Sequence, residues 1–354
     1  MASGYTYTID LHRDDGSILS QKAVAPEWGA ALEWVYFEGI RAGQLPPTLA
    51  ANLAIADYRV DPVWDPAAGQ PRVSAFRVTV PANGRGEVAR EIPLSYLRDL
   101  VQQESAALVR QGELERGDTY RYKVSAFAHS GQRSAEAGIE IAVEQMPQPL
   151  PLRPASLERF LTGAVDNESE PNRGDFPVFI PAAVLEEARG LARQAGDVET
   201  GGVLVGFLHH DADVPEVFVE ITAQIAATHT QAESAKLTFT PETWASVRGA
   251  LALRNRGETM AGWWHYHPDF CRLRNCPPES RIRCVASSAF FSADDVALHA
   301  ALFGRAFNTA LLISDSTADG LTTSLFGWRQ GMVQSRGFYA TERSSADGAR
   351  HTND

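Results

Sequence analysis

Two histidines separated by a single residue lie in the segment 262–268, which reads GWWHYHP. The residues before them are apolar and predict a β-strand, in which side chains two apart point to the same face. His265 and His267 would therefore present their imidazoles side by side. Imidazole nitrogen is a common ligand of zinc and other divalent metals, so this spacing predicts part of a metal site.

A hydrolytic metal site needs more than two imidazoles. A catalytic zinc takes three ligands from His, Asp or Glu and keeps a fourth position open for water, whose pKa it lowers to roughly 7. The two histidines and one carboxylate would supply such a set. A further carboxylate that does not bind the metal can then carry the proton of the water. Glu199, which is followed closely by Gly201 and Gly202, is the candidate for this role.

Three short elements in a fixed order resemble the JAMM motif of the JAB/MPN metalloprotease family, which includes deubiquitinases and bacterial relatives that act on ubiquitin-like proteins. The elements are Glu199, the His-Tyr-His-Pro run that starts at His265, and Ser292-x-x-Asp295. The resemblance implies that zinc is bound by His265, His267 and Asp295. It also implies that Glu199 is the general base and acid, and that Ser292 donates a hydrogen bond to the oxyanion.

Each element also has a purely structural interpretation. Ser292 is a favoured helix N-cap, and Asp295 would lie in the first turn of a helix over the apolar run 296–303. The histidine pair could make ordinary hydrogen bonds within a strand, and Glu199 could be a solvated residue at a strand start. Because all elements occur together and in order, the sequence favours the metal site.

The composition fits a soluble globular protein. The 354 residues suffice for two domains, with 44% hydrophobic and 21% charged residues. A formal net charge of −12 gives no basic surface for nucleic acid or anionic lipid. No apolar run approaches a membrane span, and no basic segment followed by an apolar stretch opens the chain. We therefore expect a cytoplasmic protein without nucleic-acid or membrane partners.

Residues 1–146 predict an α+β accessory domain for substrate or partner binding, without an active-site motif of its own. Expected strands cover 5–11, 53–60, 73–80, 119–128 and 138–144, and expected helices cover 26–41 and 93–111. A linker is expected over 147–175, proline-rich at 147–154, with a short helix at 157–161 and a polar run at 166–175.

Residues 176–340 predict the JAB/MPN domain, followed by a mobile polar tail over 341–354. Expected helices cover 181–194, 241–254 and 292–303. Expected strands cover 200–208, 216–227, 236–240, 259–265, 306–314, 321–328 and 332–339. A central mixed sheet with flanking helices agrees with the α/β, cytidine-deaminase-like fold that the resemblance implies.

An insertion over 269–291 separates the histidines from Ser292 and contains every cysteine of the chain: Cys271, Cys276 and Cys284. Clustered thiols of a cytoplasmic protein suit a second, structural zinc, which needs four ligands. Three residues are candidates for the fourth ligand: Asp269, His209 and His210. The alternative is a set of free thiols, or one disulfide with an odd cysteine left over.

The same insertion holds four arginines in an otherwise acidic protein: Arg272, Arg274, Arg281 and Arg283. One interpretation is that they contact the substrate next to the scissile bond, and the other is a solvated loop, which charge clusters usually are.

The sequence thus predicts a zinc-dependent isopeptidase or peptidase that cleaves a ubiquitin-like protein from conjugates or matures its C-terminus. Its expected partners are that protein, its conjugates, and the activating and conjugating enzymes of the same pathway. Two alternatives stay open, a hydrolase that processes a sulfur-carrier protein and a non-catalytic MPN scaffold. The RadC branch of the wider family also carries His-x-His, but the acidic balance gives no support for DNA binding.

Overall fold

The computed structural model describes residues 4–45, 58–66, 72–82, 86–115, 117–128, 150–165, 171, 174–211, 213–227, 239–277, 279, 290–316 and 320–342. The chain divides into two compact units. The first comprises Met1–Gly39, Gln44–Pro149 and Gln330–Met332, and the second comprises Ile40–Gly43, Leu150–Arg329 and Val333–Asp354. Each combines helices with β-sheet, which confirms the predicted mixture of α and β structure. No helix in these ranges has the length and apolar character needed to cross a membrane.

The first unit contains two antiparallel sheets of three strands, in the orders β2-β1-β6 and β3-β4-β5. The strands are β1 Tyr5–His12, β2 Ile18–Val24, β3 Arg59–Trp64, β4 Val73–Pro81, β5 Glu87–Pro93 and β6 Arg121–Ala128. The helices are α1 Gly29–Arg41, the 3-10 helix η3 Leu94–Leu97 and α2 Arg98–Gln111. In β1 the alternating residues Tyr7, Ile9 and Leu11 are buried, as the period of two predicts.

Two strands expected in this unit fall partly or wholly outside the described residues. Of the strand expected over 53–60, residues 53–57 lie outside them and β3 begins at Arg59. The strand expected over 138–144 lies outside them entirely. Strands β2 and β5 were not predicted. β2 is largely polar because it forms an edge, and it pairs with β1 through a hairpin in which Gly16 adopts a φ of 85°.

The second unit contains a mixed sheet whose described strands run in the order β15-β14-β13-β12-β10-β11-β9-β16-β8, with β7 also paired to β10. The strands are β7 Leu152–Pro154, β8 Ala164–Val165, β9 Val178–Pro181, β10 Gly201–His210, β11 Val217–Ala226, β12 Thr259–His267, β13 Thr309–Ser316, β14 Gly320–Arg329, β15 Met332–Arg336 and β16 Tyr339–Thr341. The helices are α3 Leu157–Thr162, α4 Ala182–Ala195, α5 Pro241–Arg254, α6 Phe270–Leu273 and α8 Ala293–Leu302.

Most predicted elements of the second unit are confirmed with small shifts at their ends. The last expected strand, 332–339, is instead divided into β15 and β16. Of the strand expected over 236–240, residues 236–238 lie outside the described residues, and Phe239 forms a single β-bridge. The helix expected at 241–254 starts after Thr240, whose side chain accepts a hydrogen bond from the Thr243 amide, with Pro241 in the first turn.

The proline-rich stretch joins the sheet of the second unit instead of acting only as a linker. Strand β7 pairs in parallel with β10, where Leu152 lies opposite Leu208, and β8 pairs with β16. Prolines lack an amide proton and are tolerated at strand ends and edges, and β7 ends at Pro154. Composition therefore predicted an extended backbone here but not its pairing partner.

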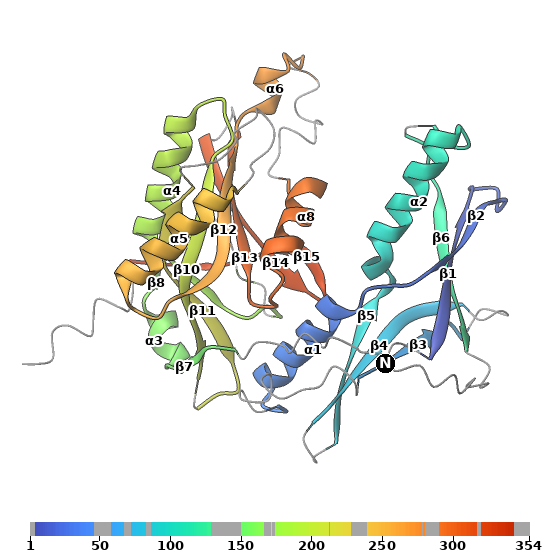
Figure 1. Ribbon diagram of the computed structural model, residues 1–354, viewed down its shortest axis with the longest axis horizontal. Coiled ribbons are helices and arrows are strands. Elements are labelled where there is room, and N and C mark those ends of the chain that lie inside the picture. Colours follow the sequence, from blue (N-terminus) through green and yellow to red (C-terminus); the bar gives the residue numbers. More distant parts are fainter. Residues whose placement is uncertain are drawn as a thin grey trace, which may run out of the picture. The chain divides into compact units, whose positions relative to one another are not determined.

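The helices of the second unit surround a curved sheet (Figure 1). Strand β12 divides two cores, because Trp263 and Trp264 point to opposite faces and both are fully buried. On the Trp263 face lies a cluster with Val247 of α5 and with Phe303, just after α8. The other face carries Tyr266, whose hydroxyl donates to the Gly196 carbonyl at the end of α4.

Candidate metal centre

The two histidines lie at the carboxyl end of strand β12. It pairs antiparallel with β10, where Gly201 lies opposite His265, and parallel with β13, where Ser314 lies opposite His267. Both imidazoles are buried, with exposed fractions of 0% and 4%. The structure thus bears out the expectation that the pair shares one face of a strand.

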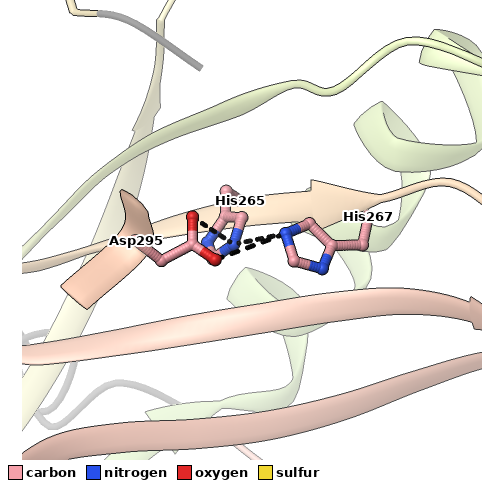
Figure 2. Close-up of side chains that lie close together, drawn as sticks. All are labelled: His265, His267 and Asp295. Carbon is pink, nitrogen blue, oxygen red and sulfur yellow. Dashed lines mark hydrogen bonds and ion pairs between the residues drawn. The ribbon is translucent and has the colours of Figure 1, made fainter. Parts of the chain in front are cut away.

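The third polar group arrives from α8. Asp295 lies close to both histidines (Figure 2), with Oδ1 3.4 Å from Nε2 of His265 and Oδ2 3.5 Å from Nε2 of His267. The two Nε2 atoms are 3.1 Å apart. One ligand atom from each of the three residues lies within 4.8 Å of the other two. Within the described ranges, these residues form a group that could hold a metal ion.

The hydrogen-bonding state of the histidines fits a metal ion. Neither Nδ1 atom has a hydrogen-bond partner among the described residues, although both are buried. A neutral imidazole carries one proton, and the proton can stay on Nδ1 while Nε2 presents a lone pair. The two Nε2 atoms lie at hydrogen-bond distance, 3.1 Å, and when both ring protons are on Nδ1 a shared cation would offset the repulsion between the two lone pairs. The donor set of two imidazoles and one carboxylate is suited to zinc, iron or manganese.

Burial and local contacts favour the metal-binding forms of His265 and Asp295. Burial lowers the pKa of His265, and the neighbouring Asp295 only partly offsets this effect. Burial alone would raise the pKa of Asp295, but hydrogen bonds from His265 and His267 outweigh it and lower that pKa. A neutral imidazole and an ionised carboxylate are the forms that ligate metals, and these are the forms that the shifts favour for His265 and Asp295.

Glu199 reaches the site from the neighbouring strand. The Tyr266 amide donates to the Thr200 carbonyl, which continues the β10–β12 register and places Glu199 opposite His267. Its Oε1 is 4.0 Å from Nε2 of His267, and its exposed fraction is 5%. The carboxylate therefore lies beside the three candidate ligands.

Ser292 has the structural role that the sequence also allowed. Its hydroxyl accepts a hydrogen bond from the Asp295 amide at 3.1 Å, and its own amide donates to Oδ2 of Asp295 at 2.7 Å. This reciprocal capping box confirms Ser292 as the N-cap of α8. The same bond fixes the Asp295 carboxylate, and the hydroxyl proton of Ser292 is not used in it.

Aromatic rings surround the imidazoles. Trp263 stacks on His265 with ring centres 4.5 Å apart and an angle of 14°. Phe291 lies against His265, and Phe290 against His267, with ring centres 5.6 and 5.1 Å apart. Sequence reasoning missed both phenylalanines, although they directly precede Ser292. Their apolar surfaces lower the local dielectric constant and so strengthen electrostatic interactions within the site.

The structure describes two of the three cysteines. Cys271 is buried on α6 and Cys276 is partly buried, with its amide bonded to the Cys271 carbonyl at 2.9 Å. Cys284 lies outside the described residues. Asp269 caps α6 through Oδ1, while its buried Oδ2 has no partner in the described part of the chain. The second zinc therefore stays a prediction, with Asp269 as a candidate fourth ligand.

The other two proposed donors to a cysteine site were wrong. His209 and His210 lie at the end of β10 remote from Gly201, and a strand of this length spans roughly 30 Å. Nε2 of His209 is instead 2.9 Å from a carboxylate oxygen of Glu220. The sequence could not show which end of the strand approaches the insertion.

The described arginines of the insertion are exposed. Arg272 forms an ion pair with Asp197. The guanidinium of Arg274 lies 5.9 Å from the ring centre of Phe270. Arg281 and Arg283 lie outside the described residues. Arg272 also lines a cavity of about 480 Å³, to which helix α4 adds two arginines that sequence reasoning missed, Arg189 and Arg193.

No protein-family model and no curated protein matches the sequence. Among solved structures, the chain is similar to the solution structure of a protein from Desulfitobacterium hafniense, with 20% sequence identity and a TM-score of 0.33. That match covers 50% of this chain and 99% of the other. Similarity at this level says nothing about the chemistry of the site.

Proposed function

We propose that the chain is a zinc-dependent amide hydrolase of the JAMM type. The convergence of His265, His267 and Asp295, with Glu199 beside them just before the adjacent strand β10, carries this proposal. These side chains come from three separate segments of the chain, and a structural role alone does not explain why they meet at one buried point. Zinc at this point would polarise the scissile carbonyl and lower the pKa of water.

The residues of the chain have distinct parts in the reaction. His265, His267 and Asp295 would hold the metal, and the lowered pKa values of His265 and Asp295 favour a neutral imidazole and an ionised carboxylate at those two positions. Glu199 accepts the proton of the attacking water and returns it to the leaving amine, so that one water is added across the C–N bond. Ser292 can donate its hydroxyl proton to the oxyanion, a contribution of about 3–4 kcal/mol for one such donor.

The proposed substrate is a ubiquitin-like protein, cleaved from its conjugates or trimmed at its C-terminus. This step rests on the resemblance of the ordered motif to deubiquitinases and their bacterial relatives. An extended, glycine-ended tail, as in ubiquitin-like proteins, is the substrate segment that this resemblance implies. Activating and conjugating enzymes of the same pathway are the proposed further partners.

The test uses ubiquitin and bacterial ubiquitin-like proteins, each fused through its C-terminal glycine to a fluorescent amide. Zinc-loaded wild-type protein should release the fluorophore from at least one fusion, and a chelator should stop the reaction until zinc is restored. Glu199→Gln should bind zinc but release almost none. Zinc-loaded protein that cleaves no fusion, or equal cleavage by Glu199→Gln, would contradict the proposal and favour a scaffold.

A further inference from the structure

A second contact joins β12 to α8 beside the candidate metal site. The indole Nε1 of Trp263 donates a hydrogen bond to Nδ1 of His299 at 3.0 Å. Both side chains are fully buried, with exposed fractions of 0%. The bond directly links the strand that carries both histidines to the helix that carries Asp295.

Two contacts, Trp263 with His299 and His265 with Asp295, join β12 to α8 at successive positions along both elements. Trp263 precedes His265 by two residues on β12, and His299 follows Asp295 by four residues on α8. Two residues of a strand rise roughly 6.6 Å, and four residues of a helix rise roughly 6 Å on nearly the same face. The spacing of Trp263 and His265 therefore matches that of His299 and Asp295.

Trp263 also restrains the ring of a candidate ligand. Its indole stacks on the His265 imidazole at 4.5 Å and 14°, so the plane of the imidazole follows the plane of the indole. The hydrogen bond to His299 fixes the indole in turn. The direction in which Nε2 of His265 points is thus set by a chain of two contacts that ends on α8.

The buried imidazole of His299 lowers the stability of the folded protein. Because Nδ1 accepts the indole proton, the proton of the neutral ring must be on Nε2, which is buried without a partner among the described residues. An unsatisfied buried polar group costs about 1–3 kcal/mol. The surroundings are aromatic, with Phe303 and Trp328 next to the ring, and would accept an apolar side chain. The acceptor at Nδ1 gives His299 a role that an apolar side chain could not fill.

We propose that Trp263 and His299 are positioning residues for the metal site. Their hydrogen bond holds α8 at the distance and rotation at which Asp295 meets His265 and His267. The inference rests on the metal site of the proposed function but not on its hydrolytic activity or substrate. It predicts that breaking this bond weakens metal binding more than an equally disruptive change elsewhere in the same core.

The experiment compares four variants with wild type by zinc affinity, measured in competition with a chromophoric chelator. His299→Leu and Trp263→Phe each remove the hydrogen bond, and the phenyl ring of the second can still stack on His265. His299→Asn keeps an acceptor near the Nδ1 position. Trp328→Phe is the matched control, since it also removes a buried indole bond, 2.8 Å long, to the Phe303 carbonyl, while its phenyl ring can still contact His299.

The expected result is a dissociation constant for zinc about 10- to 100-fold higher in His299→Leu and Trp263→Phe, as for other residues that support metal ligands. His299→Asn should recover most of the affinity, and Trp328→Phe should match wild type. The absorption of bound Co²⁺ should change only in the first two variants. Urea unfolding of the metal-free proteins shows whether each variant is folded.

Three outcomes would overturn the inference alone: wild-type zinc affinity in folded His299→Leu, an equal loss in Trp328→Phe, or no recovery in His299→Asn. Failure of hydrolysis in a protein that binds zinc normally would contradict the proposed function and leave the inference intact. A wild-type protein that binds no zinc would overturn both.

Discussion

Glu199 and His267 lie opposite each other across the β10–β12 pair, with Oε1 of the carboxylate 4.0 Å from Nε2 of the imidazole. This separation is longer than a hydrogen bond, so Oε1 of Glu199 is not hydrogen-bonded to Nε2 of His267. It is short enough for one water to contact both the carboxylate and a metal held by the histidines. The pairing of β10 with β12 therefore places Glu199 beside His267, where the proposed function needs a proton carrier.

Replacing Glu199 with Gln should separate catalysis from metal binding. The amide cannot accept the water proton, so we expect kcat/KM to fall roughly 100- to 10,000-fold. Zinc content by elemental analysis should stay at the wild-type level. Glu187→Gln, an exposed change on α4, is the control and should leave both values unchanged. Loss of zinc together with activity would instead make Glu199 a ligand.

Asp295 and its neighbour Asp294 offer a matched pair of substitutions. Both lie in the first turn of α8, but only Asp295 approaches the histidines. Asp295→Asn keeps an oxygen that can accept from the Ser292 amide and removes the ligand charge, so we expect zinc affinity to fall at least tenfold. Asp294→Asn should bind zinc as wild type does, measured by chelator competition. Equal affinities in the two variants would remove Asp295 from the ligand set.

Metal removal should destabilise the second unit. A ligand present at 100 times its dissociation constant adds about 2.7 kcal/mol to the free energy of unfolding. For a unit of this size, that corresponds to a fall in Tm of roughly 5–10 °C when a chelator removes the metal. Differential scanning calorimetry with and without chelator measures the shift, and His265→Ala should show almost none. An unchanged wild-type Tm after addition of the chelator would contradict a metal site in the folded protein.

Gly202 permits the close approach of strands around the site. A Cβ at this position would lie 2.4 Å from the Ile225 carbonyl oxygen and 2.6 Å from Nε1 of Trp264. We expect Gly202→Ala to lower the free energy of unfolding by about 1–3 kcal/mol through this overpacking. Gly190→Ala on α4 is the control, because nothing lies within 4 Å of its added Cβ and alanine favours helix. Urea unfolding should therefore show shifts of opposite sign.

His299 should make the second unit sensitive to acid. Burial lowers the pKa of His299 to about 3, below the ordinary value of 6.5, so the unfolded chain takes up a proton at higher pH than the folded one. The contribution of His299 to the free energy of unfolding is therefore fully present above pH 6.5, and it is lost as the pH falls towards 3. At pH 5 the loss is roughly 2 kcal/mol.

His299→Asn removes this titration and keeps an acceptor for Trp263. Urea unfolding at pH 8 and pH 5, followed by tryptophan fluorescence, should show a smaller loss of stability in the variant than in wild type. Parallel losses in the two proteins would show that the imidazole is not buried in its neutral form.

Local patterns in the sequence predicted the parts of the site that depend on backbone period. His265 and His267 share a face because a strand repeats every two residues, and Ser292 caps α8 because its hydroxyl satisfies a free amide. The helix over 241–254 was predicted for similar reasons, from a proline at its start and apolar spacing along it. These features need no information from distant parts of the chain.

Other features required the tertiary structure, because they depend on which distant segments meet. The sequence could not show that β7 pairs with β10, that His209 lies at the wrong end of its strand for the cysteines, or that Arg193 and Arg272 line one cavity. Long-range pairing is set by strand register and by the packing of whole elements, and neither can be recognised from the periodicity of the sequence.

By itself, the sequence determined the chemical types in this protein: two imidazoles on one strand face, a carboxylate on a capped helix and a second carboxylate before two glycines. Only the tertiary structure decided their geometry, including the approach of Asp295 to both histidines and the bond between Trp263 and His299. The physical reason is that residue type and local period are properties of a short segment. Distances of 3–4 Å between segments arise only when the sheet and its helices pack together.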